Sequence, residues 1–199
     1  MKLLFFDLEN ATGGRSNKIC ELGYVLVDEH FLILEKGNMI INPNISRREW
    51  DWYVVKKVLT RKKSEYEKSQ TFDFYYQMIN GLIKSADYVI GHTVKGDVKA
   101  LNEECKRYKL QDLNFQFYDE SVIFQITMES KQKKSVNSIL CELGVQAEGK
   151  EHDAESDAYN TMLGIKSMIE KTGKSIKDFF DYNSRAKGEN NNSVICCEY

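Results

Sequence analysis

The sequence predicts an α/β protein whose core is a five-stranded mixed sheet flanked by helices. Three observations support this class. Strand-like segments open the chain, and helical and strand-like periodicities alternate after residue 72. The composition, with 29% charged and 12% aromatic residues and a single proline, excludes collagen-like, proline-rich and wholly disordered classes. The length of 199 residues suits one domain with a substantial apolar core.

Three strands form the first part of the predicted sheet. Residues 2–7 are a short apolar run that ends on an acid, residues 21–28 alternate in polarity, and residues 31–41 alternate less regularly. The polar link from Asp28 to His30 is short, so the second and third strands should form an antiparallel hairpin. The fold therefore begins with a meander.

Helices and short strands alternate in the rest of the chain. Apolar residues recur at helical spacing over 72–84, and further helices are expected at 95–108, 120–128, 135–143 and 153–171. Residues 87–91 and 115–118 read as the fourth and fifth strands. We expect residues 1–183 to form one domain and residues 184–199, which are polar and rich in asparagine, to form a C-terminal tail.

Charge and cysteine content limit the class of partner. The formal net charge is −2, so any contact with nucleic acid must be local. The apolar start reaches Asp7 and Glu9 too soon for a signal peptide or a membrane span, and we expect no membrane partner. The five cysteines are odd in number and lack C-x-x-C spacing, which favours free thiols and a cytoplasmic protein. The Cys196-Cys197 pair receives no role.

Asp7 and Glu9 are the first candidates for chemistry. They are two residues apart on a predicted strand, so both side chains leave the same face with Cα atoms about 6.6 Å apart. Two such carboxylates repel unless a cation lies between them, and oxygen ligands suit magnesium or manganese. Taken alone, the pattern favours a plainer interpretation in which Leu8 packs inward and both acids meet water.

Further acids and one histidine strengthen the metal interpretation. Asp97 follows the strand at 87–91, Asp157 lies in the first turns of the helix at 153–171, and His152 precedes that helix. All four carboxylates could meet at one sheet edge, where ligands bind in open α/β sheets. Each residue also has a structural alternative, because acids are favoured at helix starts and a lone histidine is commonly a surface residue. Near a helix N-terminus, His152 should stay neutral and able to accept a proton.

Together these segments resemble a known family. The motifs are Phe5-Phe6-Asp7-Leu8-Glu9, then Ile90-Gly91-His92 with Asp97 and Leu101, and finally His152-Asp153-Ala154 with Asp157-Ala158. In order and spacing they resemble the three motifs of the DEDDh 3′-to-5′ exonucleases, a DnaQ-like branch of the ribonuclease H-like superfamily. The resemblance runs from about residue 2 to residue 170.

The resemblance implies an activity and a division of roles. By analogy, Asp7, Glu9, Asp97 and Asp157 would hold two divalent cations, Mg²⁺ or Mn²⁺, and His152 would act as the general base. The expected activity is hydrolysis of single-stranded DNA or RNA from the 3′ end to nucleoside 5′-monophosphates. The expected fold is ribonuclease H-like.

Two departures from the family pattern concern the substrate. Asn10, Ala11 and Thr12 stand where the family commonly has a Thr-Thr-Gly stretch that seats the terminal nucleotide, so the seat should differ. In the second motif, Thr93 replaces the usual asparagine after His92, and Gly96 replaces the usual phenylalanine before Asp97. We expect Asn10, Ala11, Thr12 and His92 to contact substrate.

Aromatic and basic residues after Pro43 are the other candidate substrate contacts. Trp50 and Tyr53 are followed by a run of lysines and arginine, and such a surface could stack unpaired bases at about 1 to 3 kcal/mol each. Equally, the aromatic residues could cover the sheet while the basic residues form an ordinary solvated face.

Two further functions are compatible with the sequence. One is a catalytically slow nucleic-acid-binding or polymerase-associated module of the same fold. The other is an unrelated α/β domain in which the acids are dispersed on the surface. Self-association is not indicated by any motif.

Overall fold

A mixed six-stranded sheet forms the centre of the computed structural model, which describes residues 1–13 and 16–190. Its strand order is β3-β2-β1-β4-β5-β6. The strands are β1 (Lys2–Asn10), β2 (Ile19–Asp28), β3 (Ile33–Ile40), β4 (Tyr88–Gly91), β5 (Phe115–Asp119) and β6 (Lys187–Asn190). The helices are η1 (Val54–Val58), α1 (Lys63–Glu67), α2 (Phe72–Ser85), α3 (Lys95–Arg107), α4 (Glu120–Thr127), α5 (Val136–Leu143), α6 (Ala154–Thr172), α7 (Ile176–Tyr182) and η2 (Ser184–Ala186).

The first three strands pair as predicted, and the fourth and fifth extend a mixed sheet. β1, β2 and β3 form an antiparallel meander, and β4 and β5 continue the sheet parallel to β1. The five predicted strands and the predicted hairpin are therefore confirmed.

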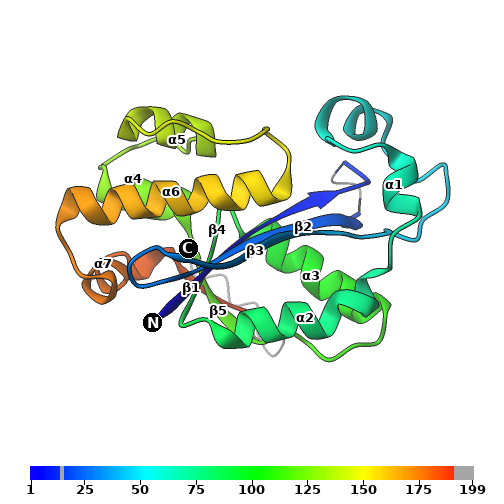
Figure 1. The fold of residues 1–199 in the computed structure, drawn as a ribbon, viewed down its shortest axis with the longest axis horizontal. Helices are drawn as coiled ribbons and strands as arrows, with labels where there is room; N and C mark the ends of the chain where they lie inside the picture. The colour runs from blue at the N-terminus through cyan, green and yellow to red at the C-terminus, as the bar shows by residue number, and fades with distance from the viewer. Residues whose placement is uncertain (14–15, 191–199) are drawn as a thin grey trace.

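Helices cover both faces of the sheet, with α2 and α3 on one side and α4, α5 and α6 on the other (Figure 1). Alternation along β1 assigns the faces. Leu4, Phe6 and Leu8 belong to the apolar cluster shared with α2 and α3, whereas Leu3 and Phe5 belong to the cluster shared with α4 to α7. The same alternation places Asp7 and Glu9 on the α6 side of β1.

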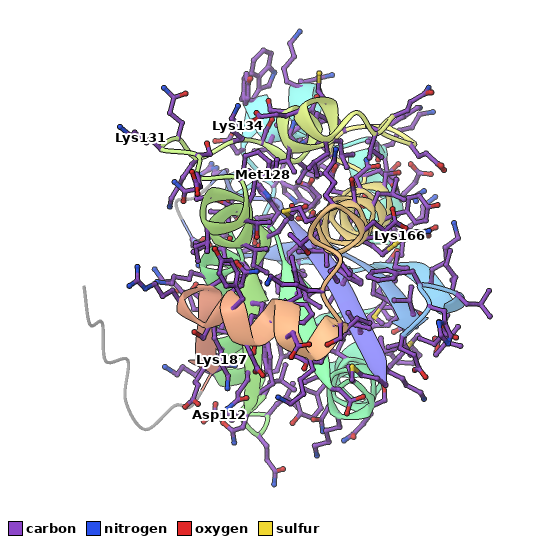
Figure 2. The ribbon with its side chains drawn as sticks, turned by 90° about the vertical axis from the view of Figure 1, so that its left-hand side faces the viewer. Asp112, Met128, Lys131, Lys134, Lys166 and Lys187 are labelled. Carbon is purple, nitrogen blue, oxygen red and sulfur yellow. The ribbon has the colours of Figure 1, made fainter. Side chains whose placement is uncertain are left out.

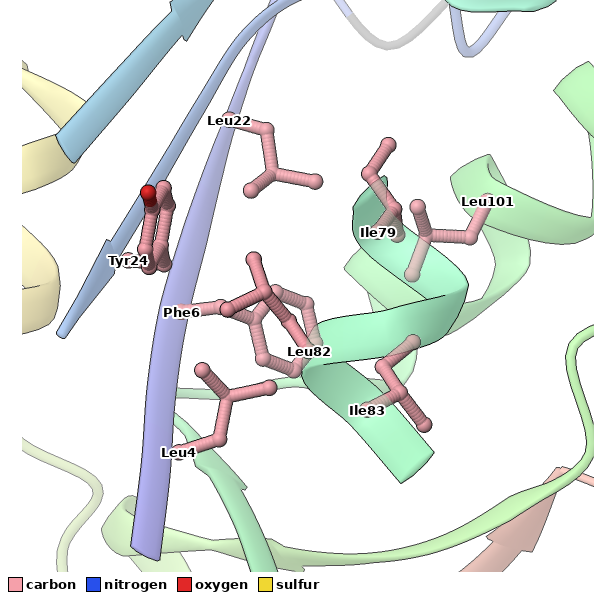
Figure 3. A pocket seen from close by; sticks show the side chains of 8 residues that line it. All are labelled: Leu4, Phe6, Leu22, Tyr24, Ile79, Leu82, Ile83 and Leu101. Carbon is pink, nitrogen blue, oxygen red and sulfur yellow. The ribbon is translucent and has the colours of Figure 1, made fainter. Parts of the chain in front are cut away.

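A small void lies inside the first of these clusters. It has a volume of about 10 Å³ and is lined mostly by aliphatic side chains of β1, β2, α2 and α3, including Leu4, Leu22 and Ile79 (Figure 3). A space of this size holds at most one water molecule, and an apolar lining gives a water too few partners. The void is therefore a packing feature of the core and not a ligand site.

The sixth strand corrects the sequence prediction. Five strands were expected and residues 184–199 were expected to form a tail, but η2 and β6 occupy residues 184–190, and β6 pairs antiparallel with β5. The segment Lys187–Asn190 lacks apolar alternation because it is an edge strand held by backbone pairing. Asn190 adds side-chain hydrogen bonds to Asn102 and to the Leu113 carbonyl. The Cys196-Cys197 pair lies outside the described residues.

Three short helices, η1, α1 and α7, were also not predicted. No helix in the described part of the chain is long and apolar enough to cross a membrane.

Candidate active site

The end of β1 forms one wall of the candidate site. Asp7 pairs in register with Gly23 of β2, and Glu9 pairs with Glu21. A Cβ atom on Gly23 would lie 1.9 Å from the Ala154 carbonyl carbon, so only glycine lets the start of α6 approach the sheet this closely. The close approach brings Asp157, in the first turn of α6, towards Asp7.

The turn before α6 places His152 in the same site. Asp153 caps α6 by accepting a hydrogen bond from the Ser156 N–H at 3.2 Å, as short polar residues commonly do at this position. His152 has a φ of +63°, and its backbone N–H donates to Asp157 Oδ2 at 2.9 Å. Its ring Nδ1 lies 3.8 Å from Glu9 Oε1. His152 is thus held by one of the predicted metal ligands and faces another.

A pocket of about 290 Å³ opens where these elements meet. Its lining comes from β1, from the loop after β4, from the start of α5 and from the turn before α6. The lining residues are Asp7, Leu8, Glu9, His92, Ser135, Val136, Asn137, Glu151, His152 and Asp157. Within it, Glu9, His152 and Asp157 each offer one ligand atom, and these atoms lie within 4.8 Å of one another.

Asp97, which lies on α3, adds a fourth carboxylate to this cluster of acids. Burial raises the pKa of its carboxyl well above the usual range, and the charges of Asp7 and Glu9 raise it further. These charge effects show that Asp97 adjoins the β1 acids, although it is not part of the pocket lining. The four predicted carboxylates and His152 therefore gather at one end of β1.

Electrostatics distinguish this group from an ordinary acidic surface. Burial first, and then the charge of Asp157, raise the pKa of Asp7 to about 8. Burial and the charges of Asp7 and Asp157 raise the pKa of Glu9 to about 9, and burial also raises the pKa of Asp157. Four acids packed with so little compensating positive charge favour an added cation. Because all four offer hard oxygen ligands, the set fits a divalent cation such as Mg²⁺ or Mn²⁺.

His92 also lines the pocket. Its Nδ1 is 2.9 Å from Oε2 of Glu120, the first residue of α4, whose side chain is fully buried. The backbone at Thr93 adopts a φ of +52°, and its N–H donates to Asp119 Oδ1 at 3.1 Å. Asp119 thus caps α4, as its position before a helix predicts, and also fixes the second-motif loop.

Sequence reasoning missed Glu120. The signal available was a second acid directly after Asp119 at a strand end, but nothing local indicates that His92, 28 residues earlier, is its partner.

The loop after Glu9 is closed by its own hydrogen bonds. The Ala11 N–H donates to the Lys18 carbonyl, and the Ala11 carbonyl accepts from the Asp51 N–H. The Thr12 side chain is buried, and its hydroxyl donates to the Ser16 carbonyl. The backbone groups of Ala11 and the hydroxyl of Thr12 therefore already have protein partners, which does not favour the expected substrate contact through these atoms. Asn10 is half-buried, and its Oδ1 has no hydrogen-bond partner among the described residues.

The expectation that Trp50 stacks on bases is also corrected. Its side chain is only 8% exposed and packs with Ala11, Cys20 and Tyr66, while Lys63 lies over its ring. It fails as a stacking surface because it anchors the segment at 45–67 to the sheet. Tyr53 is 62% exposed and stays available.

Two basic residues near the site have protein partners. Arg61 Nε lies 3.5 Å from Glu21 Oε1, and Arg61 Nη2 lies 3.8 Å from Asp153 Oδ2. Lys134, which Figure 2 labels, pairs with Glu142 and lies over the Phe124 ring. Gly96 is surrounded by open space, since a Cβ atom there would meet no atom within 4 Å.

Carboxylates and a histidine gather at one edge of this α/β sheet. Such a site is of the kind that can hold metal ions. The profile of the exonuclease family RNase_T matches residues 4–163, and the chain belongs to this family. The family assignment supports nuclease activity. A search of curated protein sequences finds no significant match.

Solved structures with the same fold include several nucleases. The nuclease domain of 3′hExo, a DEDDh family member bound to rAMP, is 17% identical with a TM-score of 0.73; the match covers 86% of this chain and 92% of that one. Exonuclease I of E. coli, in complex with a dT13 oligonucleotide, is 15% identical with a TM-score of 0.68 over 91% of this chain and 43% of that one. S. pombe Pop2p, in a form with Mg²⁺ and Mn²⁺ bound, is 15% identical with a TM-score of 0.70 over 93% of this chain and 87% of that one. These similarities establish the fold.

Proposed function

We propose that this protein is a metal-dependent 3′-to-5′ exonuclease that hydrolyses single-stranded DNA or RNA to nucleoside 5′-monophosphates. The observation that carries the proposal is the meeting of Asp7, Glu9, Asp157 and His152 around one pocket, with Asp97 adjoining. Two structural neighbours are solved with nucleic acid or a nucleotide, rAMP for 3′hExo and dT13 for Exonuclease I. The free thiols at Cys20, Cys105 and Cys141 accord with a cytoplasmic location, which is part of the proposal.

The four carboxylates would hold two divalent cations. When bound, such cations lower the pKa of an attacking water and neutralise charge on the leaving oxygen. The residues of the chain then have separate tasks. Asp7 and Glu9 supply oxygen ligands from a strand within the sheet, Asp157 supplies one from α6, and Asp97 supplies one from α3.

His152 would act as the general base. It lies in a half-exposed turn, and its backbone is fixed by Asp157 while its ring remains at the pocket. The attacking water gives a proton to the ring, its oxygen bonds to phosphorus, and the bond from phosphorus to the 3′ oxygen breaks. The shortened strand leaves with a 3′ hydroxyl after that oxygen gains a proton. The other product is a nucleoside 5′-monophosphate.

Substrate contacts would come from two groups that remain available. Tyr53 offers an exposed ring, and His92 lines the pocket, whereas the amide oxygen of Asn10 is buried. An exposed aromatic ring can stack on any unpaired base, which suits a substrate that is single-stranded at its 3′ end.

The deciding experiment is digestion of 5′-labelled single-stranded DNA and RNA oligonucleotides with Mg²⁺, with Mn²⁺ and with chelator. Asp7→Ala serves as the inactive variant. Asp181→Ala serves as the matched control, because Asp181 is an exposed acid on α7 paired only with Lys177. We expect a ladder that shortens from the 3′ end and yields nucleoside 5′-monophosphates. It should require metal, vanish with Asp7→Ala and persist with Asp181→Ala.

Two results would overturn the proposal. Internal fragments in place of a ladder would indicate an endonuclease. Absence of cleavage under every condition, with retained binding of the same oligonucleotides, would indicate a nucleic-acid-binding module.

A further inference from the structure

Glu120 is a fully buried carboxylate whose environment gives it one hydrogen-bond partner. Its Oε2 lies 2.9 Å from His92 Nδ1, and its Oε1 has no partner among the described residues. Oε1 packs against Gly164 of α6, where a Cβ atom would lie only 2.2 Å away. Burying an unpaired negative charge is costly, and burial raises the pKa of the Glu120 carboxyl, so the side chain is either protonated or paired with a protonated His92.

The pair fixes how His92 meets the pocket. In both cases one proton lies between Glu120 Oε2 and His92 Nδ1, and the ring's other proton is on Nε2. The other ring nitrogen, Nε2, lies on the opposite edge of the ring and has no hydrogen-bond partner among the described residues. Because the ring lines the pocket beside Asp7 and Asp157, Nε2 is the polar atom of His92 that a bound molecule can use.

The two histidines of the pocket have different surroundings. The His152 side chain is 47% exposed, and its Nδ1 is 3.8 Å from Glu9 Oε1. The His92 side chain is 16% exposed and is held by Glu120. Of the two, His92 is therefore the histidine whose hydrogen-bond donor at Nε2 is set by a protein partner.

We propose that Glu120 is a positioning residue that holds His92 so that its Nε2 donates a hydrogen bond to a phosphate oxygen of the 3′-terminal nucleotide. The inference rests on the proposed exonuclease function and assigns the phosphate contact within that site. A phosphate is the part of a nucleic acid that matches such a donor, because it is anionic and accepts hydrogen bonds. The remaining ionisable groups on the pocket wall are the carboxylates, which repel phosphate in the absence of cations, and the half-exposed His152.

The test compares His92→Gln, Glu120→Gln and the double variant, with Asp181→Ala as the surface control. Glu120→Gln keeps the shape of the side chain and removes its charge. We measure kcat and KM on a single-stranded oligonucleotide, and inhibition by a nucleoside 5′-monophosphate and by the corresponding nucleoside. His92→Gln should lower kcat about 100-fold, as removal of a donor to a reacting oxygen does, and Glu120→Gln should lower it about tenfold.

The inhibitors separate a phosphate contact from a general structural effect. Inhibition by the monophosphate should weaken in both variants, whereas inhibition by the nucleoside should not change. The double variant should equal His92→Gln, because Glu120 acts through that ring. Thermal melting checks folding, and if Glu120→Gln fails to fold, His92→Gln together with the inhibitor pair carries the test.

Two outcomes would overturn the inference. Folded variants with wild-type kcat and unchanged monophosphate inhibition would leave Glu120 with a structural role only. Equal weakening by nucleoside and monophosphate would place the contact away from the phosphate. Failure of the exonuclease proposal is recognised separately, because the wild-type protein itself would then not shorten the oligonucleotide.

Discussion

Glu9 and Glu21 face each other in register across β1 and β2, yet they lie in opposite electrostatic environments. Glu21 is fully buried, and its carboxylate receives the Tyr66 hydroxyl, the Asn38 amide at 3.0 Å and the Arg61 guanidinium at 3.5 Å. Glu9 is nearly as deeply buried but lies among Asp7 and Asp157, and its ion-pair partner among the described residues is His152, with Nδ1 at 3.8 Å. Burial alone therefore does not distinguish a functional acid from a structural one. The number of protein partners distinguishes the two acids.

The largest expected effect comes from removing the charge of Glu9. Glu9→Gln should lower turnover on the order of 10³-fold, because bound metal supplies several kcal/mol of transition-state stabilisation and each ~1.4 kcal/mol is a factor of ten. In chelator the variant should be more stable than wild type, because the neutral amide avoids the cost of burying Glu9 beside Asp7 and Asp157. Single-turnover kinetics and thermal melting measure both quantities. If Glu9→Gln kept wild-type turnover, Glu9 would be a structural acid like Glu21.

The next effect concerns His152, the nearest basic group to Glu9. His152→Ala should lower turnover about 10²-fold and leave Mn²⁺ binding intact, because loss of a general base slows proton transfer without removing a carboxylate. Calorimetric titration with Mn²⁺ measures metal binding, and a turnover assay measures the rate, so the two effects are separated. Loss of metal binding would make His152 a ligand and not the base.

A smaller effect is expected on the Glu21 side. Tyr66→Phe removes one donor from a buried carboxylate that keeps its other partners, which should cost about 1 to 2 kcal/mol of unfolding free energy without changing turnover. Tyr24→Phe is the matched control, because the Tyr24 hydroxyl donates at 2.7 Å to Glu35, an exposed carboxylate that water can solvate. Denaturant titrations of both variants give the comparison. Equal losses would show that burial of the acceptor does not matter here.

The last prediction is a dependence of stability on pH. The pKa of Asp7 is raised to about 8 and that of Glu9 to about 9, both above their unfolded values. The folded protein in chelator therefore binds more protons than the unfolded chain, and stability present at low pH is lost as pH rises towards 9. We expect the melting temperature to fall on the order of 10 °C between pH 5 and pH 9, and Mg²⁺ to reverse the fall. An Asp7→Asn variant should show a shallower slope, and a flat wild-type profile would contradict the assignment.

The sequence predicted the parts of the fold whose signals are local. The five apolar strands and the helices with a buried face were identified from residue spacing, and the acids were placed at one edge because they follow strands or begin helices. β6 was missed because Lys187–Asn190 has no apolar alternation and is recognised only by its pairing with β5.

The parts that failed depend on partners far apart in the chain. Trp50 looked like a surface aromatic because its contact with Tyr66 lies outside any local pattern, and Glu120 showed no sign of its pairing with His92. The pairing of Arg61 with Glu21 gave no local sign either, because the two residues are 40 positions apart in the sequence. These errors share one cause, since a buried polar contact between distant segments leaves no periodicity to detect.

Gly23 has a consequence for how substitutions in this chain should be interpreted. The residue carries no chemistry, but any side chain there would collide with the start of α6 and move Asp157 away from Asp7. In a saturation screen for activity, position 23 should therefore behave like a catalytic position. A ranking of positions by intolerance would list Gly23 beside the acids, although its contribution is the space that it leaves empty.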